Sequence, residues 1–462
     1  MHPLFELLQK ANLLNKRGVN KEALLRIDFS KLLYLSLQAK EITSSKDMPR
    51  ENSIFSHSAS ISLSGGRSPC SEAECRIDRA NQLAQFAALY SDRVYIRNFF
   101  ADYIESPYNL LPINLEQELF FKTHFYNDLL VLNHLRPLIE KGKIIPITPP
   151  NYCLDCLTID TFGKEANKRF LSAVNHIERR YRKNISARFL YQNGNFSIEI
   201  DGPDNLIEHG FISWHFRNDP DLFSDTPSLL KKVMSSKRVE LLPKDIKALG
   251  LDKKYSWDVL SNILFELSIA QISNTVFLTE RNIAIEFLRK ISPAPEIEER
   301  NQIIQDNLSC MMPFIQGISP AKLLELREKE EDAFILFRQG LNTAVKEYKN
   351  QKGSFTKKDA VAIYGEYLEP QLVRIDQKVK QAKRHLIKGA GVKVFSYASA
   401  ISLGIYTGFL QKDLASIAST LGLANILAEL TQSVLNDSDT EESIRNESMY
   451  FLWKVRQQSK QK

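Results

Sequence analysis

The stretch LAQFAALYSDRVYI, residues 83–96, places a helical pattern directly before a strand pattern. Its first part repeats apolar side chains at the spacing of one helix face, namely at Leu83, Phe86, Ala87 and Tyr90. Its second part alternates from Arg93 to Arg97, with Val94 and Ile96 on one side, as in a half-buried strand. The stretch therefore predicts a helix that leads into a strand.

The same order of elements follows once more along the chain. Leu115–Lys141 is a long amphipathic pattern that Gly142 ends, and Lys143–Thr148 is a short β-type run closed by two prolines. A helix followed by a strand, twice in succession, predicts an α/β or α+β fold for the N-terminal region. Before it, Ser44–Arg67 is rich in Ser, Gly and Asn without periodicity, so we expect a long loop there.

A small antiparallel meander is predicted farther along. The strands Ser186–Gln192 and Phe196–Ile200 flank Asn193-Gly194, the dipeptide that best adopts the positive φ angles of a two-residue hairpin turn. A third strand fits within Leu206–Phe216. The region is completed by a helix and a strand, at Ser256–Ser273 and near Val276.

Strand patterns become scarce beyond the Pro- and acid-rich stretch Pro293–Arg300, so the C-terminal region should be all-α. Three parts are expected from these boundaries. They are a mixed α/β domain over residues 1–292, a helical region over 293–390, and a small-residue helical hairpin with a terminal amphipathic helix over 391–462.

The composition is that of a globular chain with more than one domain. Of its 462 residues, 43% are hydrophobic and 25% are charged, which lies outside the regime of disordered chains. A net charge of +6 is small for this length and does not by itself indicate nucleic-acid binding. Met1–Leu14 carries Glu6 and Lys10 inside its apolar pattern and lacks a secretory signal, so a cytoplasmic location is expected.

Four of the five cysteines fall into two close pairs, Cys70 with Cys75 and Cys153 with Cys156. Both pairs are predicted in turn-like settings, where backbone amides can point at thiolate sulfurs. Two such turns brought together can supply four thiolates tetrahedrally to one structural zinc ion. The alternatives are buried or free cysteines without metal, and redox chemistry at the second pair, which the intervening Asp155 opposes.

The histidines offer two weaker catalytic hypotheses. His209 and His215 lie an even number of residues apart on a predicted strand, so they should share a face, with Asp201 and Glu208 nearby in sequence. The other hypothesis concerns the predicted helix Lys164–Lys183, where Arg169 and His176 resemble the Arg/His motif of HEPN-type ribonucleases. A polar residue usually follows that arginine, whereas Phe170 stands here.

The small-residue region contains two uncharged runs within residues 394–435. Gly404 and Gly408, with Ala400, would let two antiparallel helices pack closely. Basic residues upstream and the aromatic run Tyr450–Trp453 downstream are typical of membrane-surface anchoring. A soluble hairpin is the preferred interpretation, because hydroxyl side chains dilute the first run and the second is too short to span a bilayer.

Four segments together resemble a group of bacterial proteins to which no activity is assigned. They are residues 83–96, residues 135–150, residues 324–341 with a Phe-x-x-Phe-Arg core, and the motif MYFLWK at residues 449–454. The resemblance extends over nearly the whole chain, and such proteins often occur beside mobile or antiviral genes. It implies a bacterial source and a role in phage defence, and it implies no activity.

The leading hypothesis is therefore a bacterial sensor, regulatory or interaction protein that has a protein partner and is not an enzyme. The sequence contains no Gly-x-Ser-x-Gly elbow, Walker loop, Gly-x-Gly-x-x-Gly turn or His-Glu-x-x-His motif, and Ser64-Gly65-Gly66 alone is no phosphate cradle. One alternative is an effector that acts on a membrane through residues 394–435. The other is a hydrolase or nuclease, with nucleic acid as its partner.

Overall fold

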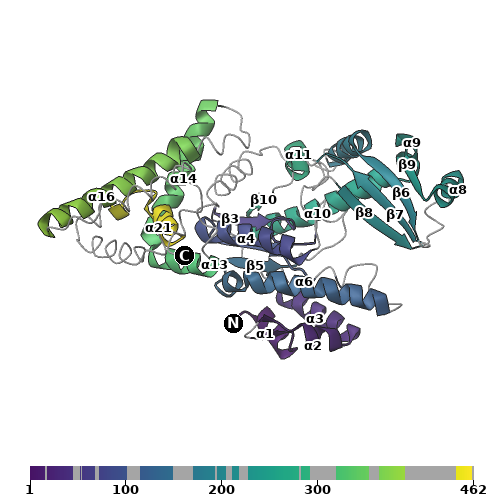
Figure 1. Ribbon diagram of the computed structural model, residues 1–462, viewed down its shortest axis with the longest axis horizontal. Helices are drawn as coiled ribbons and strands as arrows, with labels where there is room; N and C mark the ends of the chain where they lie inside the picture. The colour runs from purple at the N-terminus through teal and green to yellow at the C-terminus, as the bar shows by residue number, and fades with distance from the viewer. Residues whose placement is uncertain are drawn as a thin grey trace. The chain divides into compact units, whose positions relative to one another are not determined.

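The computed structural model describes most of the chain, and its residues form two compact units (Figure 1). Unit 1 comprises residues 1–87 and 91–302, and unit 2 comprises residues 88–90 and 303–462. The described residues are 1–15, 18–44, 53, 55–67, 72–100, 103, 115–148, 170–192, 195–203, 211–217, 227–279, 282–291, 319–352, 364–390 and 444–459. The boundaries expected at 292 and 390 stay predictions.

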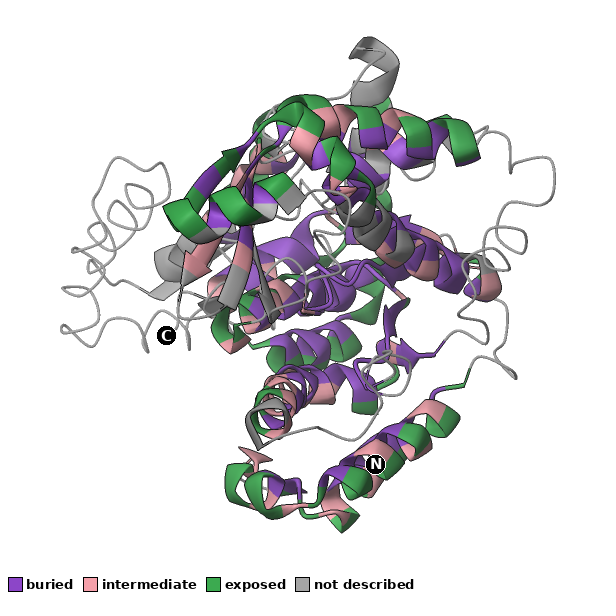
Figure 2. Cartoon of the chain, turned by 90° about the vertical axis from the view of Figure 1, so that its right-hand side faces the viewer, coloured by how far each residue is buried: buried purple, intermediate pink, exposed green. Residues whose placement is uncertain are grey.

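The centre of unit 1 is a parallel four-stranded sheet. Its strands are β3 (Ser56–Ala59), β4 (Arg93–Arg97), β5 (Ile144–Ile147) and β10 (Val276–Leu278), in the order β10-β3-β4-β5. The two helix–strand pairs of the sequence thus lead into β4 and β5, as predicted. Figure 2 shows the middle of this unit buried, which suits a parallel sheet covered on both faces.

Helices cover the two faces of this sheet. On β3, His57 contacts Phe86 of α4 (Ala73–Leu89), with ring centroids 5.1 Å apart. The next residue, Ser58, lies 3.4 Å from Ser273 of α10 (Leu251–Ser273), measured between hydroxyl oxygens. Successive strand residues point to opposite faces, so α4 and α10 lie on opposite sides. The helix α6 (Leu115–Glu140) joins α4, because right-handed crossovers from β3 to β4 and from β4 to β5 place both helices on one face.

The loop expected over residues 44–67 was wrong in one respect, because it contains the strand β3. Its sequence Ser-His-Ser-Ala has too few apolar residues to show a strand pattern, yet all four residues are buried. Local hydroxyl partners make this burial tolerable. The Ser58 hydroxyl lies 2.6 Å from that of Thr275, and His57 Nδ1 lies 2.6 Å from the hydroxyl of Ser91.

An antiparallel sheet forms the second part of unit 1, and the predicted meander is confirmed. Its strands are β6 (Ser186–Gln192), β7 (Asn195–Asp201), β8 (Phe211–Arg217) and the unpredicted β9 (Arg238–Leu241), in the order β8-β7-β6-β9. Gln192 pairs with Asn195, so two residues connect β6 and β7. Those two, Asn193 and Gly194, lie outside the described residues.

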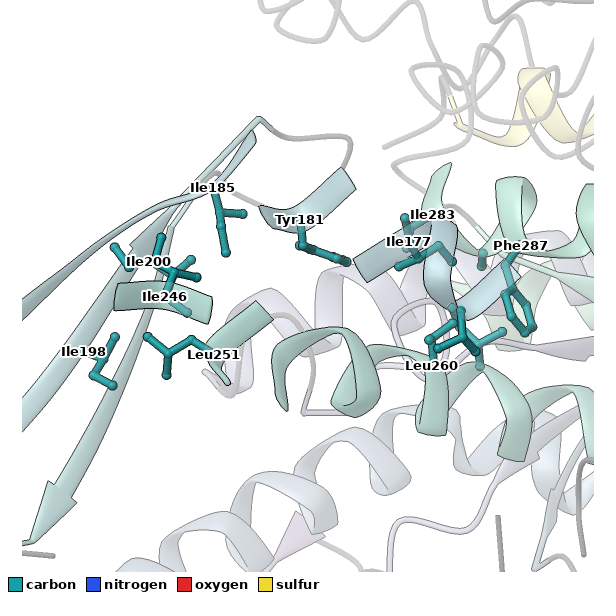
Figure 3. Close-up of a cluster of buried hydrophobic side chains, with 14 of the residues drawn as sticks. Ile177, Tyr181, Ile185, Ile198, Ile200, Ile246, Leu251, Leu260, Ile283 and Phe287 are labelled. Atoms are coloured by element: carbon teal, nitrogen blue, oxygen red, sulfur yellow. The ribbon is translucent and has the colours of Figure 1, made fainter. Parts of the chain in front are cut away.

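One face of this sheet packs into a hydrophobic core (Figure 3). Alternate residues such as Phe189, Ile198 and Ile200 are fully buried there. They meet side chains from the helix over residues 170–184, from α10, and from the helices α8 (Pro227–Ser236), α9 (Pro243–Ala248) and α11 (Asn282–Ile291). Because α10 contributes to this core and also covers the parallel sheet, it links the two sheets of unit 1.

The N-terminal segment adds three helices to unit 1, α1 (Pro3–Lys10), α2 (Lys21–Arg26) and α3 (Phe29–Ile42), and a small hairpin of β1 (Leu14–Asn15) and β2 (Gly18–Val19). Its end joins the parallel sheet, because Ser44 pairs with Thr148 beyond β5. The amide of Asn98 donates to the hydroxyls of Thr43 at 2.9 Å and Thr148 at 3.0 Å. This fully bonded triad has a structural role.

Unit 2 is helical in its described part. It contains α13 (Pro320–Lys329), α14 (Glu331–Lys352), the π-helical turn η3 (Tyr364–Leu368), α16 (Glu369–Ala390) and α21 (Tyr450–Ser459). The aromatic run suggested as a membrane anchor is instead buried: Tyr450 and Phe451 are 0% exposed and Trp453 is 2% exposed. The indole of Trp453 also donates to Asp376 on α16 at 2.5 Å. These side chains therefore hold the helices of unit 2 together.

Within the described part of the chain, no helix has the length and apolarity needed to cross a bilayer. The predicted helical hairpin over residues 394–435 lies outside the described residues.

Candidate functional site

The parallel sheet points all its strands the same way, so their carboxyl ends meet at one edge. From β3 the chain moves sideways to β4 and β5, but the last strand, β10, joins on the other side of β3. The order of strands therefore reverses between β3 and β10. In doubly wound sheets of this kind, ligands bind outside the carboxyl ends of the strands at the point of reversal. The turn after β3, residues 60–67, lies there.

This turn is tightly built from its own backbone. The amide of Ser60 donates to the carbonyl of Leu278 on β10 at 2.9 Å, and the amide of Gly66 donates to the carbonyl of Ile61 at 2.7 Å. From α10, the buried carboxylate of Glu266 accepts from the amide of Ile61 at 2.6 Å. Because these amides already have acceptors, the turn is not an open phosphate cradle, as the sequence indicated.

Two glycines are required at the end of the turn. Gly65 has a φ of +80°, and an added Cβ would lie 2.6 Å from the carbonyl oxygen of Arg76 and 2.9 Å from Val131. A Cβ on Gly66 would lie 2.8 Å from the carbonyl oxygen of Ile61. The backbone of the turn therefore sits directly against α4 and α6, with no space for a side chain.

Behind the turn lies a buried polar group of five side chains, Arg67, Arg76, Tyr103, His124 and Asp128, which we call the Asp128 cluster. Arg76 donates through Nε to the carbonyl of Gly65 at 2.7 Å and through Nη2 to Asp128. The other carboxylate oxygen of Asp128 accepts from Arg67 Nη2 at 2.7 Å and from the hydroxyl of Tyr103 at 2.5 Å. The guanidinium of Arg67 also stacks over the ring of Tyr103, 4.2 Å from its centroid.

Helix lengths explain why Asp128 reaches this edge. At about 1.5 Å per residue, α6 is about 39 Å long, whereas a four-residue strand such as β5 spans roughly 13 Å. The first half of α6 therefore extends beyond the carboxyl ends of the strands. His124 and Asp128 are one helical turn apart on that half, so they face the same way.

The protonation states of the cluster follow from burial and charge. Burial alone would raise the pKa of Asp128, but Arg67 and Arg76 outweigh burial and hold that pKa below its usual value. Burial and the adjacent Asp128 raise the pKa of Tyr103 well above its usual value, so its hydroxyl stays protonated. Burial, together with Arg67, lowers the pKa of His124. At neutral pH the cluster therefore combines two guanidinium cations, one carboxylate and two neutral rings.

Two nitrogens of the Asp128 cluster lack hydrogen-bond partners among the described residues. They are Nη1 of Arg76, whose side chain is 0% exposed, and Nδ1 of His124. A buried donor without an acceptor destabilises a fold by about 1–3 kcal/mol. Arg67 lies at the outer side of the cluster, with 30% of its side chain exposed. The cluster can therefore accept further hydrogen-bond acceptors and negative charge.

The predicted zinc ligands are mostly beyond the reach of the structure. Cys70, Cys153 and Cys156 lie outside the described residues, and Cys75 is exposed on α4. The turn-like setting expected for Cys75 was wrong, because this residue stands in the first turn of that helix. Among the described residues, no three His, Cys, Asp or Glu side chains are grouped to hold a metal ion.

The predicted catalytic histidines are not assembled into a site by the described residues. His209, Glu208 and Arg169 lie outside them, and His215 pairs with Ser197 in the register of β8 and β7. Asp201 lies 3.3 Å from the guanidinium of Arg188.

His176 belongs to a partly exposed contact between the helix over residues 170–184 and α11. Its Nε2 lies 2.7 Å from Glu286, which also binds Arg180. Burial and the nearby cations, Lys290 first among them, lower the pKa of His176, so this contact is a neutral hydrogen bond at pH 7. It has the character of a structural link between two helices.

Comparison of the chain with protein-family models, with curated proteins and with solved structures finds no match. The order of its strands and the helices on both faces define the centre of unit 1 as a small doubly wound α/β sheet.

Proposed function

We propose that the chain is a sensor or regulatory protein whose unit 1 binds a small ligand at the carboxyl edge of the parallel sheet. The observation that supports this most strongly is the turn over residues 60–67, at the point where the strand order reverses. Its backbone is fixed by Glu266 from one face of the sheet and by Arg76 from the other. Such a rigid edge, built from both helical layers, is a suitable place for a ligand to change how those layers pack.

Ligand binding to the purified full chain tests this proposal. ATP, GTP and NAD⁺ are suitable probes, because doubly wound sheets bind nucleotides at this edge. Calorimetric titration should give saturable binding for at least one of them. Glu266→Gln should weaken it by about tenfold or more, since a neutral amide holds the turn less firmly. The matched control is Glu240→Gln on β9, where the side chain is 64% exposed. The proposal fails if none of the three nucleotides binds, or if both variants bind like the parent protein.

Several parts of this proposal rest on sequence alone. A bacterial source, a cytoplasmic location, a protein partner and a role in phage defence come from the composition and the resemblance of the chain. A structural zinc ion at Cys70, Cys75, Cys153 and Cys156 comes from their spacing. Elemental analysis of the purified protein, with Cys153→Ser as the comparison, tests the metal: one zinc per chain is expected, and the variant should lose it.

The two alternatives also rest on sequence alone. Action on a membrane would use residues 394–435, which lie outside the described residues, and a hydrolase or nuclease would use His209 and His215. Flotation with liposomes tests the first, and the activity of a His209→Ala/His215→Ala double variant tests the second.

A further inference from the structure

The Asp128 cluster contains more positive charge and more hydrogen-bond donors than a structural staple needs. A staple for the turn would require one arginine and one carboxylate, and Arg76 with Asp128 provides both. The second guanidinium, from Arg67, leaves the described side chains of the cluster with one excess positive charge. Buried ion pairs are stable only when charge and hydrogen bonds are balanced, so the excess requires an explanation.

We propose that the Asp128 cluster binds a phosphate-type oxyanion, which accepts hydrogen bonds from Nη1 of Arg76 and Nδ1 of His124. Both nitrogens are buried and lack acceptors among the described residues. His124 donates in the tautomer that carries its proton on Nδ1. The anion also neutralises the second guanidinium, so binding satisfies two donors and one charge together.

The shape and chemistry of the donors favour an oxyanion over a simple halide. A planar guanidinium offers parallel N–H donors that match two oxygens of phosphate or sulfate. The neighbouring residues Tyr103, Phe99 and Phe120 supply aromatic surface, with Arg76 5.8 Å from the ring centroid of Phe99 and His124 4.2 Å from that of Phe120. The low polarity of these rings strengthens the attraction between the anion and the guanidinium groups.

This inference deepens the proposed function and rests on it for the biological role of the anion. The oxyanion is either free phosphate or the phosphate group of a larger ligand at the turn over residues 60–67. The two sources are distinguished by experiment, because free phosphate competes with a phosphate-bearing ligand only if both use the same donors.

The first test measures the melting temperature of the full chain with inorganic phosphate and with chloride at equal ionic strength. Phosphate at about ten times its Kd should raise the melting temperature by roughly 2–5 °C more than chloride does. Sulfate should act in the same direction. Equal stabilisation by phosphate and chloride would overturn the proposal, whatever the behaviour of any variant.

The second test compares variants by calorimetric titration with phosphate. Arg67→Gln should weaken phosphate binding by about tenfold or more, because it removes the excess charge. His124→Phe should also weaken it, since the ring is kept but the donor is lost. The matched control is Arg26→Gln on α2, whose side chain is 82% exposed and should leave binding unchanged. If Arg67→Gln binds phosphate as tightly as the parent protein, the assignment of the site is wrong.

The results separate the inference from the proposed function. Phosphate binding that depends on Arg67, in a protein that binds none of the three nucleotides, supports the anion site and refutes the nucleotide test of the sensor. Nucleotide binding that neither phosphate nor Arg67→Gln affects supports the sensor and refutes the anion site.

Discussion

At Gly65 a single backbone angle and a single close approach determine the turn after β3. The residue has a φ of +80°, and a Cβ there would meet the carbonyl oxygen of Arg76 at 2.6 Å. Gly142 also has a positive φ, +65°, but nothing lies within 4 Å of its Cβ position. The pair therefore separates the strain of the backbone angle from the effect of the collision.

We expect Gly142→Ala to lower the free energy of unfolding by about 1 kcal/mol, from backbone strain alone. Gly65→Ala should lower it by more than about 2 kcal/mol, because α4 or the turn must also move. Urea denaturation of both variants measures the difference. Equal losses would show that the turn does not pack against Arg76 as described.

Asp128 is the carboxylate that balances the buried arginines. Asp128→Asn leaves both guanidinium groups without their counter-charge, so we expect a loss of about 3–5 kcal/mol of unfolding free energy at pH 7. The pKa of Asp128 is lower in the folded protein than its usual value of 3.8. Its stabilisation is therefore complete above pH 3.8 and is lost as the pH falls through the folded-state pKa.

The same variant thus gives a pH test. The difference in stability between the parent protein and Asp128→Asn should be constant near neutral pH and shrink in acid below about pH 4. A difference that persists unchanged at pH 2–3 would contradict the charged role of Asp128.

The residues of the candidate site carried little signal in the sequence. Arg76 stands among Glu74, Asp78 and Arg79, a pattern typical of a solvated helix face, yet its side chain is fully buried. Its burial depends on Asp128, which is 52 residues away in the chain and on another helix. The Gly65-Gly66 pair was the one local sign, and it indicates a turn without indicating what surrounds it.

At the scale of elements, periodicity predicted α4, β4, α6, β5 and the antiparallel meander, because their apolar residues recur at the spacing of a helix or a strand. It failed for β3, where serine and histidine are buried through hydroxyl partners on distant elements. The terminal aromatic run was misinterpreted for a related reason. Its composition suits a membrane surface, but the side chains fill the core between α14, α16 and α21.

The packing of α14 against α21 gives a prediction at this scale. A Cβ on Gly340 of α14 would lie 2.8 Å from the terminal carbon of Met449 and 3.0 Å from Cβ of Ser448. Gly340→Ala should lower the free energy of unfolding by about 1 kcal/mol, because overpacking exceeds the gain in helix propensity.

Gly365, in the turn η3, is the matched control, since nothing lies within 4 Å of its Cβ position. Gly365→Ala should leave stability unchanged or raise it slightly. If thermal unfolding shows the two variants to be equally stable, α21 does not pack on Gly340.

At the scale of the whole molecule, the sequence predicted a mixed α/β N-terminal part and a helical C-terminal part, and the structure has both. What the sequence could not provide is the order of strands, because β10 joins β3 from more than 200 residues away in sequence, through the pairing of Phe277 with Ser58. That long-range pairing creates the reversal of strand order on which the proposed ligand site depends.

Hydrogen–deuterium exchange of the full chain, with and without saturating nucleotide, tests the central claim most directly. Because a ligand suppresses local opening where it binds, exchange should slow by about tenfold or more in residues 55–67 and 93–100, while residues 195–203 stay unchanged. Slowing confined to the antiparallel sheet or to unit 2, with residues 55–67 unaffected, would contradict a ligand site at the carboxyl edge of the parallel sheet.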